Sequence, residues 1–139
     1  MIKVKICGIT RIQDALLSAE LGAWAVGFVF YQKSKRFIDP LETRKIIEQL
    51  PDTIKKVGVF VNPTAQYVKE TVEKSGLTTV QLHGEESSEF CADLKYEIIK
   101  CLHIENEDDL DTPLLYTKIP YFLFDGFDDE LRGGDRQAC

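Results

Sequence analysis

The stretch KVKICGIT, residues 3–10, decides the fold. Its β-branched residues run up to Ile6 and favour a buried strand, and Gly8 then permits a tight turn. Thr10 is a residue type that often begins a helix. A strand, a turn and a helix start within eight residues predict one βα unit, with Cys7 standing where the chain leaves the sheet.

The same pattern of an apolar run followed by a turn and a helix start recurs along the chain. Short apolar runs follow one another at intervals of about 20 to 30 residues, which is the size of a βα unit. These runs are IKVKIC (2–7), AVGFVF (25–30), KKVGVFV (55–61), TTVQLH (78–83), EIIKCL (97–102) and YFLFD (121–125).

Helix signals fill most of the intervals between these runs. Thr10 and Gln13 have the spacing of a capping box, and Asp39 with Pro40 predicts the start of a second helix. We expect a third helix from Asn62-Pro63 to Gly76 and a fourth from about Glu86 to Leu94. A fifth helix between Glu105 and Lys118 is poorly supported, because Pro113 interrupts an acidic stretch.

Strands that are almost continuously apolar and alternate with helices predict a parallel sheet covered by helices. Two architectures fit this α/β pattern, a doubly wound open sheet and part of a (β/α)8 barrel. In both, ligands bind where the strands end. The residues at these ends are Cys7, Phe30, Asn62, His83, His103 and Asp125.

Composition limits the classes of function. The 139 residues predict a single domain, 1–139, and a net charge of -6 disfavours nucleic acid and anionic membranes as partners. The absence of a long apolar run or a signal peptide predicts a cytoplasmic protein. Four cysteines without close pairs predict reduced thiols. His83 and His103 with a cysteine could in principle form a metal site, but no candidate ligands have helical i,i+4 or C-x-x-C spacing, so we expect none.

Two strand-end residues are candidates for acid and base chemistry. Cys7 could simply pack in the core, but a thiol at the ligand end of a strand can also accept a proton. Asp125 could supply the matching acid, although an Asp before Gly more often caps a turn.

The segment YQKSKRF, residues 31–37, gathers Lys33, Lys35 and Arg36 in an otherwise acidic chain. It could be a solvated loop, or it could receive an anionic substrate, with Arg36 binding a carboxylate through two hydrogen bonds. Gln81 and His83 place polar groups where a core strand would favour Val or Leu. Gln81 is a candidate for hydrogen bonding inside a barrel, and His83 is a candidate for either a surface residue or a ligand contact.

Five of these stretches taken together resemble the phosphoribosylanthranilate isomerase family of tryptophan biosynthesis. They are VKICGIT, AVGFVF with SKR, VGVFVN, VQLHGEE and FLFD, in this order and at these intervals. The resemblance implies a (β/α)8 barrel that converts N-(5-phosphoribosyl)anthranilate into its 1-deoxyribulose phosphate isomer by an Amadori rearrangement. It implies a small phosphorylated substrate and no cofactor.

The resemblance also implies roles for individual residues. Cys7 corresponds to the general base, which removes the proton from C2 of the ring-opened Schiff base. Asp125 corresponds to the general acid, which protonates the furanose ring oxygen. Arg36 matches a residue that meets the anthranilate carboxylate, and His83 with Gln81 belongs to the substrate pocket.

The likeness weakens after residue 134. The family continues with further βα units, whereas this sequence ends in DRQAC, residues 135–139, so we expect an incomplete barrel of about six units from an early stop or a frameshift. The alternative to an active isomerase is an inactive remnant or a half-barrel that acts only by association. We expect unpaired sheet edges near Ile2, Val4, Phe122 and Phe124 to promote self-association. The other architecture, a response-regulator domain, would need strand-end aspartates where this chain has Cys7, Asn62 and His83.

Overall fold

A computed structural model of the chain describes residues 2–126, which form one six-stranded parallel sheet. The strands are β1 (Lys5–Cys7), β2 (Ala25–Val29), β3 (Lys55–Phe60), β4 (Thr79–Leu82), β5 (Glu97–Ile104) and β6 (Tyr121–Gly126). Their spatial order is their chain order. In a doubly wound sheet the strand order reverses at a switch point. The unbroken order here therefore identifies the strands as consecutive strands of a barrel wall.

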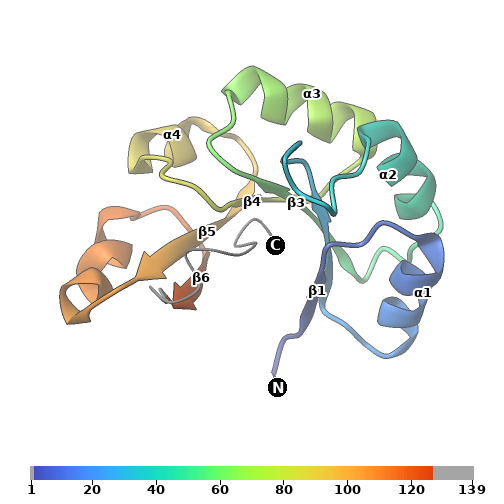
Figure 1. Cartoon of the computed structure of the whole chain (residues 1–139), viewed down its shortest axis with the longest axis horizontal. Coiled ribbons are helices and arrows are strands. Elements are labelled where there is room, and N and C mark those ends of the chain that lie inside the picture. Colours follow the sequence, from blue (N-terminus) through green and yellow to red (C-terminus); the bar gives the residue numbers. More distant parts are fainter. Residues whose placement is uncertain (1, 127–139) are drawn as a thin grey trace.

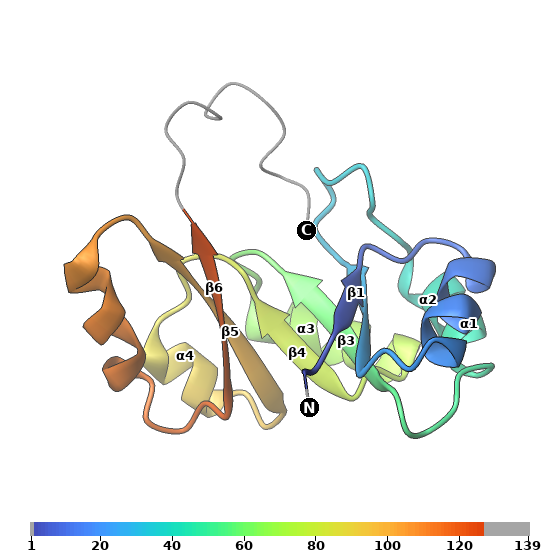
Figure 2. The same ribbon diagram turned by 90° about the horizontal axis from the view of Figure 1, so that it is seen from below.

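Helices cover the outer side of the curved sheet, as the arc around the strands shows (Figure 1). The hydrogen-bonded order of the strands runs from β1 to β6, and in a perpendicular view β5 and β6 lie on one side of the sheet while β1 lies toward the other (Figure 2). The helices are α1 (Ile12–Glu20), α2 (Pro40–Ile47), α3 (Ala65–Ser75) and α4 (Ser88–Asp93). None of the helices described within residues 2–126 is long and apolar enough to cross a membrane.

Side-chain caps fix where most of these helices begin. The carboxylate of Asp39 accepts a hydrogen bond from the Leu41 amide at 2.8 Å, and Pro40 follows at the first helical position as predicted. Thr64 and Ser87 cap α3 and α4 in the same way, one or two residues after the predicted starts. The predicted capping box of Thr10 is wrong.

Helix α1 begins differently from the others. Arg11 occupies the N-cap without a capping side-chain hydrogen bond and instead pairs with Asp14, 2.9 Å away. The end of this helix agrees with the sequence, because Gly22 takes the left-handed conformation just beyond it.

The connection between β5 and β6 is a 3-10 helix, η1 (Glu107–Leu115), rather than an α-helix. Asn106 and Asp109 form a capping box at its start, and Pro113 lies inside it. The tighter 3-10 winding suits a short acidic segment that Pro113 prevents from forming regular α-helical hydrogen bonds.

The two faces of the sheet carry different residues, because side chains alternate along each strand. The outer face packs against the helices and contributes Val26, Phe28, Phe60 and Leu82 to the main core, each with 0% exposure. The inner, concave face holds a smaller apolar cluster of Ala25, Val57 and Ile99 with the flanking Trp24, Tyr121 and Leu123. Val29 and Val59 also lie on this face, and polar residues such as Lys55, Thr79 and Gln81 occupy other positions on it.

Within the described residues, β1 and β6 form the two outer edges of the sheet. The apolar residues expected at these edges are exposed in three cases of four, namely Ile2 (89%), Val4 (49%) and Phe124 (56%). Phe122 is the exception, since it is half-buried and packs edge-on against Tyr116 of the η1 connection.

Candidate functional site

Parallel register brings the chemistry-bearing residues to one face of the sheet. Cys7 pairs with Gly27, Gln81 with Ile99, and His103 with Asp125. Alternation along the strands then places Cys7, Gln81 and Asp125 on the concave face, toward the carboxyl ends of their strands. This is the end at which barrels of parallel strands carry their active sites.

The thiol of Cys7 depends on the neighbouring glycine for its space. A Cβ atom on Gly27 would lie 3.0 Å from the Cys7 sulfur and 3.2 Å from the Lys5 ammonium nitrogen. A side chain at position 27 would therefore displace both groups. Cys7 itself is half-buried and unbonded to any other cysteine, so its sulfur remains a chemically usable thiol.

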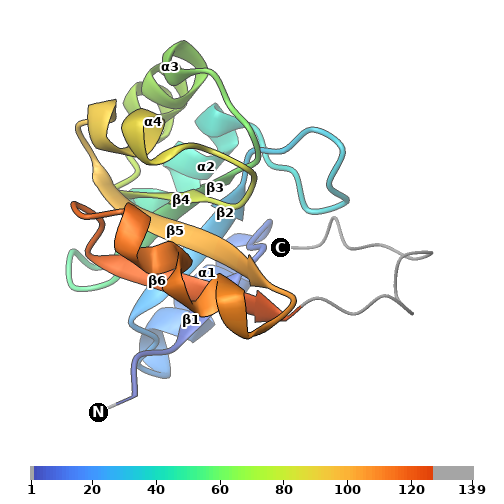
Figure 3. The same ribbon diagram turned by 90° about the vertical axis from the view of Figure 1, so that its left-hand side faces the viewer.

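Arg36 lies against the turn that follows Cys7. Gly8 has a φ of +82°, and a Cβ atom there would meet the Arg36 Cδ at 2.4 Å. Gly8 therefore serves two needs, a left-handed backbone and the close approach of the guanidinium stem. The segment between β2 and α2 that carries Arg36 projects beyond the carboxyl ends of the strands, where it is drawn in cyan (Figure 3).

Four further side chains gather where β4, β5 and β6 end. The His83 Nε2 atom lies 3.6 Å from the Cys101 sulfur and 3.6 Å from Asp125 Oδ2. The His103 Nδ1 atom lies 3.8 Å from the same carboxylate oxygen. We call His83, Cys101, His103 and Asp125 the strand-end cluster.

His83 is the most buried imidazole of this cluster. Burial lowers its pKa below the ordinary value of 6.5, and the nearby His103 lowers it further, against the opposing effect of Asp125. Its Nδ1 atom contacts Gln81 Nε2 at 3.1 Å. Gln81 is completely buried, and its Oε1 atom has no hydrogen-bond partner among the described residues.

A second polar cluster lies behind the first, on the helix-facing side of the same strands. Lys100 forms a buried ion pair with Glu86 at 3.0 Å and donates to the backbone carbonyls of Gly84 and Cys101. Glu86 in turn accepts hydrogen bonds from the amides of Asn62 and Gly84. This ion pair ties together the loops that follow β3 and β4.

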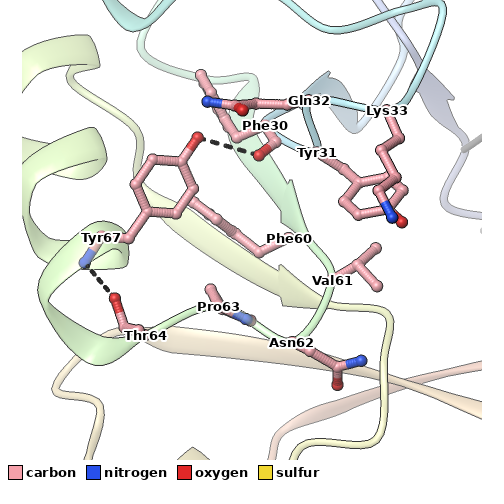
Figure 4. A pocket seen from close by; sticks show the side chains of 10 residues that line it. All are labelled: Phe30, Tyr31, Gln32, Lys33, Phe60, Val61, Asn62, Pro63, Thr64 and Tyr67. Atoms are coloured by element: carbon pink, nitrogen blue, oxygen red, sulfur yellow. Dashed lines mark hydrogen bonds between the residues drawn. The ribbon is translucent and has the colours of Figure 1, made fainter.

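Two residues predicted at the strand ends do not join the strand-end cluster. Phe30 belongs to the helix-facing core, stacked on Phe60, and the Asn62 side chain accepts from the Glu85 amide. Both line a separate pocket of about 420 Å³, with Lys33 and Tyr67 also in its wall (Figure 4). The Tyr67 hydroxyl donates to the Phe30 carbonyl across this pocket.

Cys101 is the member of the strand-end cluster that the sequence analysis did not select. The interpretation there asked for ligands close in sequence, whereas His83, Cys101 and His103 present ligand atoms within 4.8 Å of one another across two strands. The C-x-H spacing at residues 101–103 could have revealed it, since alternate residues of a strand share a face.

Comparison with known proteins shows which family this chain belongs to. A model of the family described as N-(5'-phosphoribosyl)anthranilate (PRA) isomerase matches residues 4–136. The isomerase of Pelobacter propionicus is 44% identical over 134 residues, which cover 96% of this chain and 64% of the relative. The chain belongs to the N-(5'-phosphoribosyl)anthranilate isomerase family.

Other members of the isomerase family agree in sequence and in structure. The enzyme of Thermotoga neapolitana is 50% identical over 125 residues, covering 88% of this chain and 61% of the relative. The crystal structure of the Thermotoga maritima isomerase superposes with a TM-score of 0.88 at 45% identity, covering 94% of this chain and 64% of that one. The chain thus spans less than two thirds of the length of these isomerases.

One solved isomerase was crystallised with reduced 1-(o-carboxyphenylamino)-1-deoxyribulose 5-phosphate. It superposes with a TM-score of 0.86 at 46% identity, covering 92% of this chain and 66% of that one. The predicted barrel family is therefore confirmed. The residues predicted from the resemblance remain predictions, and the predicted end of the barrel after residue 126 lies outside the described residues.

Proposed function

We propose that this chain carries the acid and base of a phosphoribosylanthranilate isomerase. The reaction is the Amadori rearrangement of N-(5-phosphoribosyl)anthranilate to 1-(2-carboxyphenylamino)-1-deoxyribulose 5-phosphate, a step of tryptophan biosynthesis. The observation that supports the proposal is that Cys7 and Asp125 share the concave face of the sheet, at the carboxyl ends of β1 and β6. The relative crystallised with the reduced product analogue supports this substrate class.

The proposed chemistry needs one acid and one base and no other reactant. Asp125 protonates the furanose ring oxygen, the ring C–O bond breaks, and the anomeric carbon becomes an iminium. The Cys7 thiolate then takes the proton from C2, giving an enol amine. This becomes the amino ketone as C1 gains a proton from the Cys7 thiol and the C2 hydroxyl gives its proton to the Asp125 carboxylate, which restores both residues. No atoms are gained or lost, so the proposal includes no cofactor.

The remaining candidates have positioning or binding roles in this proposal. Arg36, held over Gly8, binds the anthranilate carboxylate with its planar guanidinium. His83 lies beside Asp125 and contacts substrate, while Gln81 is too buried for that contact and orients His83 through its ring nitrogen. Gln81 is therefore a positioning residue.

The test combines this chain with the C-terminal part of a known isomerase. The 139-residue chain is co-expressed with the C-terminal third of the Thermotoga maritima isomerase, and loss of the substrate's anthranilate fluorescence is measured. Cys7→Ser and Asp125→Asn should each lower turnover by about 10²- to 10⁴-fold, because each removes one proton-transfer group. Cys91→Ser, at a buried thiol of α4, is the control and should keep turnover.

Near-normal turnover of Cys7→Ser would remove the thiol from the mechanism. Unchanged turnover of Asp125→Asn would leave Asp125 with the turn-capping role considered from the sequence. Growth of a tryptophan auxotroph that lacks the isomerase gives an independent readout of the same variants.

The sheet edges lead us to propose that the isolated 139-residue chain self-associates and isomerises its substrate too slowly to be useful. Ile6 of β1 and Phe124 of β6 are 41% and 56% exposed. Unpaired strands beside exposed apolar side chains favour pairing with another chain. Light scattering should show a mass that rises with concentration, and a stable active monomer would contradict the proposal.

We also propose a cytoplasmic location. Among the described residues, Cys7, Cys91 and Cys101 form no disulfide, which suits a reducing compartment. Localisation of the tagged chain by cell fractionation checks this, and recovery outside the cytoplasm would contradict it.

A further inference from the structure

We propose that the strand-end cluster is a binding site for a borderline-soft divalent cation, with Zn²⁺ as the best fit. Its ligands are His83 Nε2, the Cys101 thiolate, His103 Nδ1 and Asp125 Oδ2. One sulfur, two imidazole nitrogens and one carboxylate oxygen form a donor set that tetrahedral zinc accepts.

The ligand atoms of His83, Cys101 and His103 lie within 4.8 Å of one another, and Asp125 Oδ2 lies beside the two imidazoles. Zinc bonds of about 2.0 to 2.3 Å place neighbouring ligand atoms of a tetrahedron about 3.3 to 3.6 Å apart. His83 Nε2 already lies 3.6 Å from both the Cys101 sulfur and Asp125 Oδ2, and His103 Nδ1 lies 3.8 Å from Asp125 Oδ2. The His103 side chain is 44% exposed, so it has room to close the remaining gap.

Gln81 supplies the second observation that points to a ligand. A metal-binding histidine commonly donates its other ring N–H to an oxygen acceptor. The buried Oε1 of Gln81 has no hydrogen-bond partner among the described residues, although its amide lies against His83 Nδ1. Half a turn of this amide brings Oε1 to Nδ1, so that Nδ1–H donates to Oε1 and the Nε2 lone pair is left for the metal.

The surroundings tolerate an added positive charge. Lys100 lies on the outer side of β5, and its ion pair with Glu86 compensates its charge. Binding would release the proton of the Cys101 thiol into solution.

The site also has a consequence for catalysis, and this part rests on the proposed function. A cation held by Asp125 and His83 withdraws the proposed acid and one substrate contact at the same time. Zinc should therefore inhibit isomerisation, and a chelator should restore it.

Cobalt substitution of the full 139-residue chain tests the site without any activity measurement. Co²⁺ should produce a thiolate charge-transfer band in the near ultraviolet and the visible bands of a tetrahedral ion, and Zn²⁺ should displace it. Cys101→Ser should remove the ultraviolet band, whereas the control variants Cys91→Ser and Cys7→Ser should keep it. An unchanged band in Cys101→Ser would overturn the proposal.

Two further variants test the site in case the Cys101→Ser variant, which changes a buried residue, does not fold. His103→Asn changes an exposed side chain and should weaken Zn²⁺ binding in a competition with a chromophoric chelator. Gln81→Met keeps side-chain volume, removes the proposed acceptor and should weaken binding by about 10- to 100-fold. Wild-type affinity in both variants, or equal affinity for Mg²⁺ and Zn²⁺, would overturn the site.

The activity arm separates the two proposals. One outcome is that the co-expressed enzyme binds zinc, as shown by displacement of the cobalt spectrum, and still isomerises its substrate at an unchanged rate. That result would overturn the role of Asp125 and leave the metal site standing. Isomerisation that is insensitive to zinc and a chain without a cobalt spectrum would together overturn the metal site and leave the acid and base untouched.

Discussion

Strands β4 and β5 carry a polar cluster on each face, and the two clusters differ in how completely they are bonded. On the helix-facing side, the Lys100 ammonium group has four partners, including Glu86 at 3.0 Å and the Gly84 carbonyl at 2.7 Å. On the concave side, contacts of 3.6 to 3.8 Å join members of the strand-end cluster, and His83 also contacts the Gln81 amide at 3.1 Å. The Oε1 atom of that amide has no hydrogen-bond partner among the described residues.

This difference in bonding gives the Lys100–Glu86 pair a structural role and the strand-end cluster a binding role. A buried charge is tolerable only with close partners, so the Lys100–Glu86 pair can hold loops in place but has no capacity left for a ligand. The strand-end cluster keeps donor and acceptor capacity for a molecule or ion that arrives later. The sharpest tests therefore remove one partner on each face and compare the costs.

The largest effect is expected on the helix-facing side. Glu86→Ala leaves the Lys100 ammonium buried without its carboxylate and should lower the free energy of unfolding by about 3 to 5 kcal/mol. Urea denaturation of the chain measures this loss. The control is Glu42→Ala, which breaks the exposed pair with Lys45 and should cost less than about 1 kcal/mol. Similar costs for the two variants would remove the distinction between the faces.

A smaller effect of opposite sign is expected on the concave side. Gln81→Met removes a buried amide whose oxygen is unbonded, so the free energy of unfolding should stay unchanged or rise by about 1 kcal/mol. Lys100→Met is the matched change on the other face and should be clearly destabilising. A loss of more than about 1 kcal/mol in Gln81→Met would show that the amide is structurally needed.

The smallest effect concerns the amino ends of the same concave face. Burial alone would raise the Glu97 pKa, but hydrogen bonds from Lys55 and Thr79 outweigh it and hold the pKa below the ordinary 4.5. The unfolded chain then binds a proton more readily than the folded one, so this contribution is present above pH 4.5 and is lost as the pH falls through the lowered value.

Urea midpoints at pH 7 and below pH 4.5 measure this linkage. Glu97→Gln should reduce the difference between the two midpoints, and Asp93→Asn, at the end of α4, serves as an acidic control that should not. An unaltered difference in Glu97→Gln would contradict the assignment.

The order of helices and strands could be predicted from the sequence because local residues mark where most helices begin and end. Asp39 with Pro40 marks a helix start by local hydrogen bonding, and Gly76 marks a helix end by its left-handed backbone. The start at Arg11 could not be predicted, since an N-cap without a side-chain bond leaves no signature. The 3-10 winding around Pro113 was likewise ambiguous from composition alone.

The candidate site was predictable only in part, for a geometric reason. The rule that ligands meet strand ends was enough to select Cys7, His83 and Asp125. It does not say which face a side chain takes, so it also selected Phe30, which points into the helix layer. Cys101 lies two residues before His103 and enters the cluster only through the register between β4, β5 and β6.

The aromatic contact at the amino ends of the strands has an optical consequence. Trp24 is the sole tryptophan of the chain, and its ring lies edge-on to Tyr121 of β6 at 5.4 Å, with the Lys3 and Lys55 ammonium groups 5.2 and 5.6 Å from it. Its emission spectrum is thus a single-site reporter of whether the start of β2 and β6 are together. A shift of that emission before the helical circular dichroism signal changes would record β6 detaching while the helix layer is still intact.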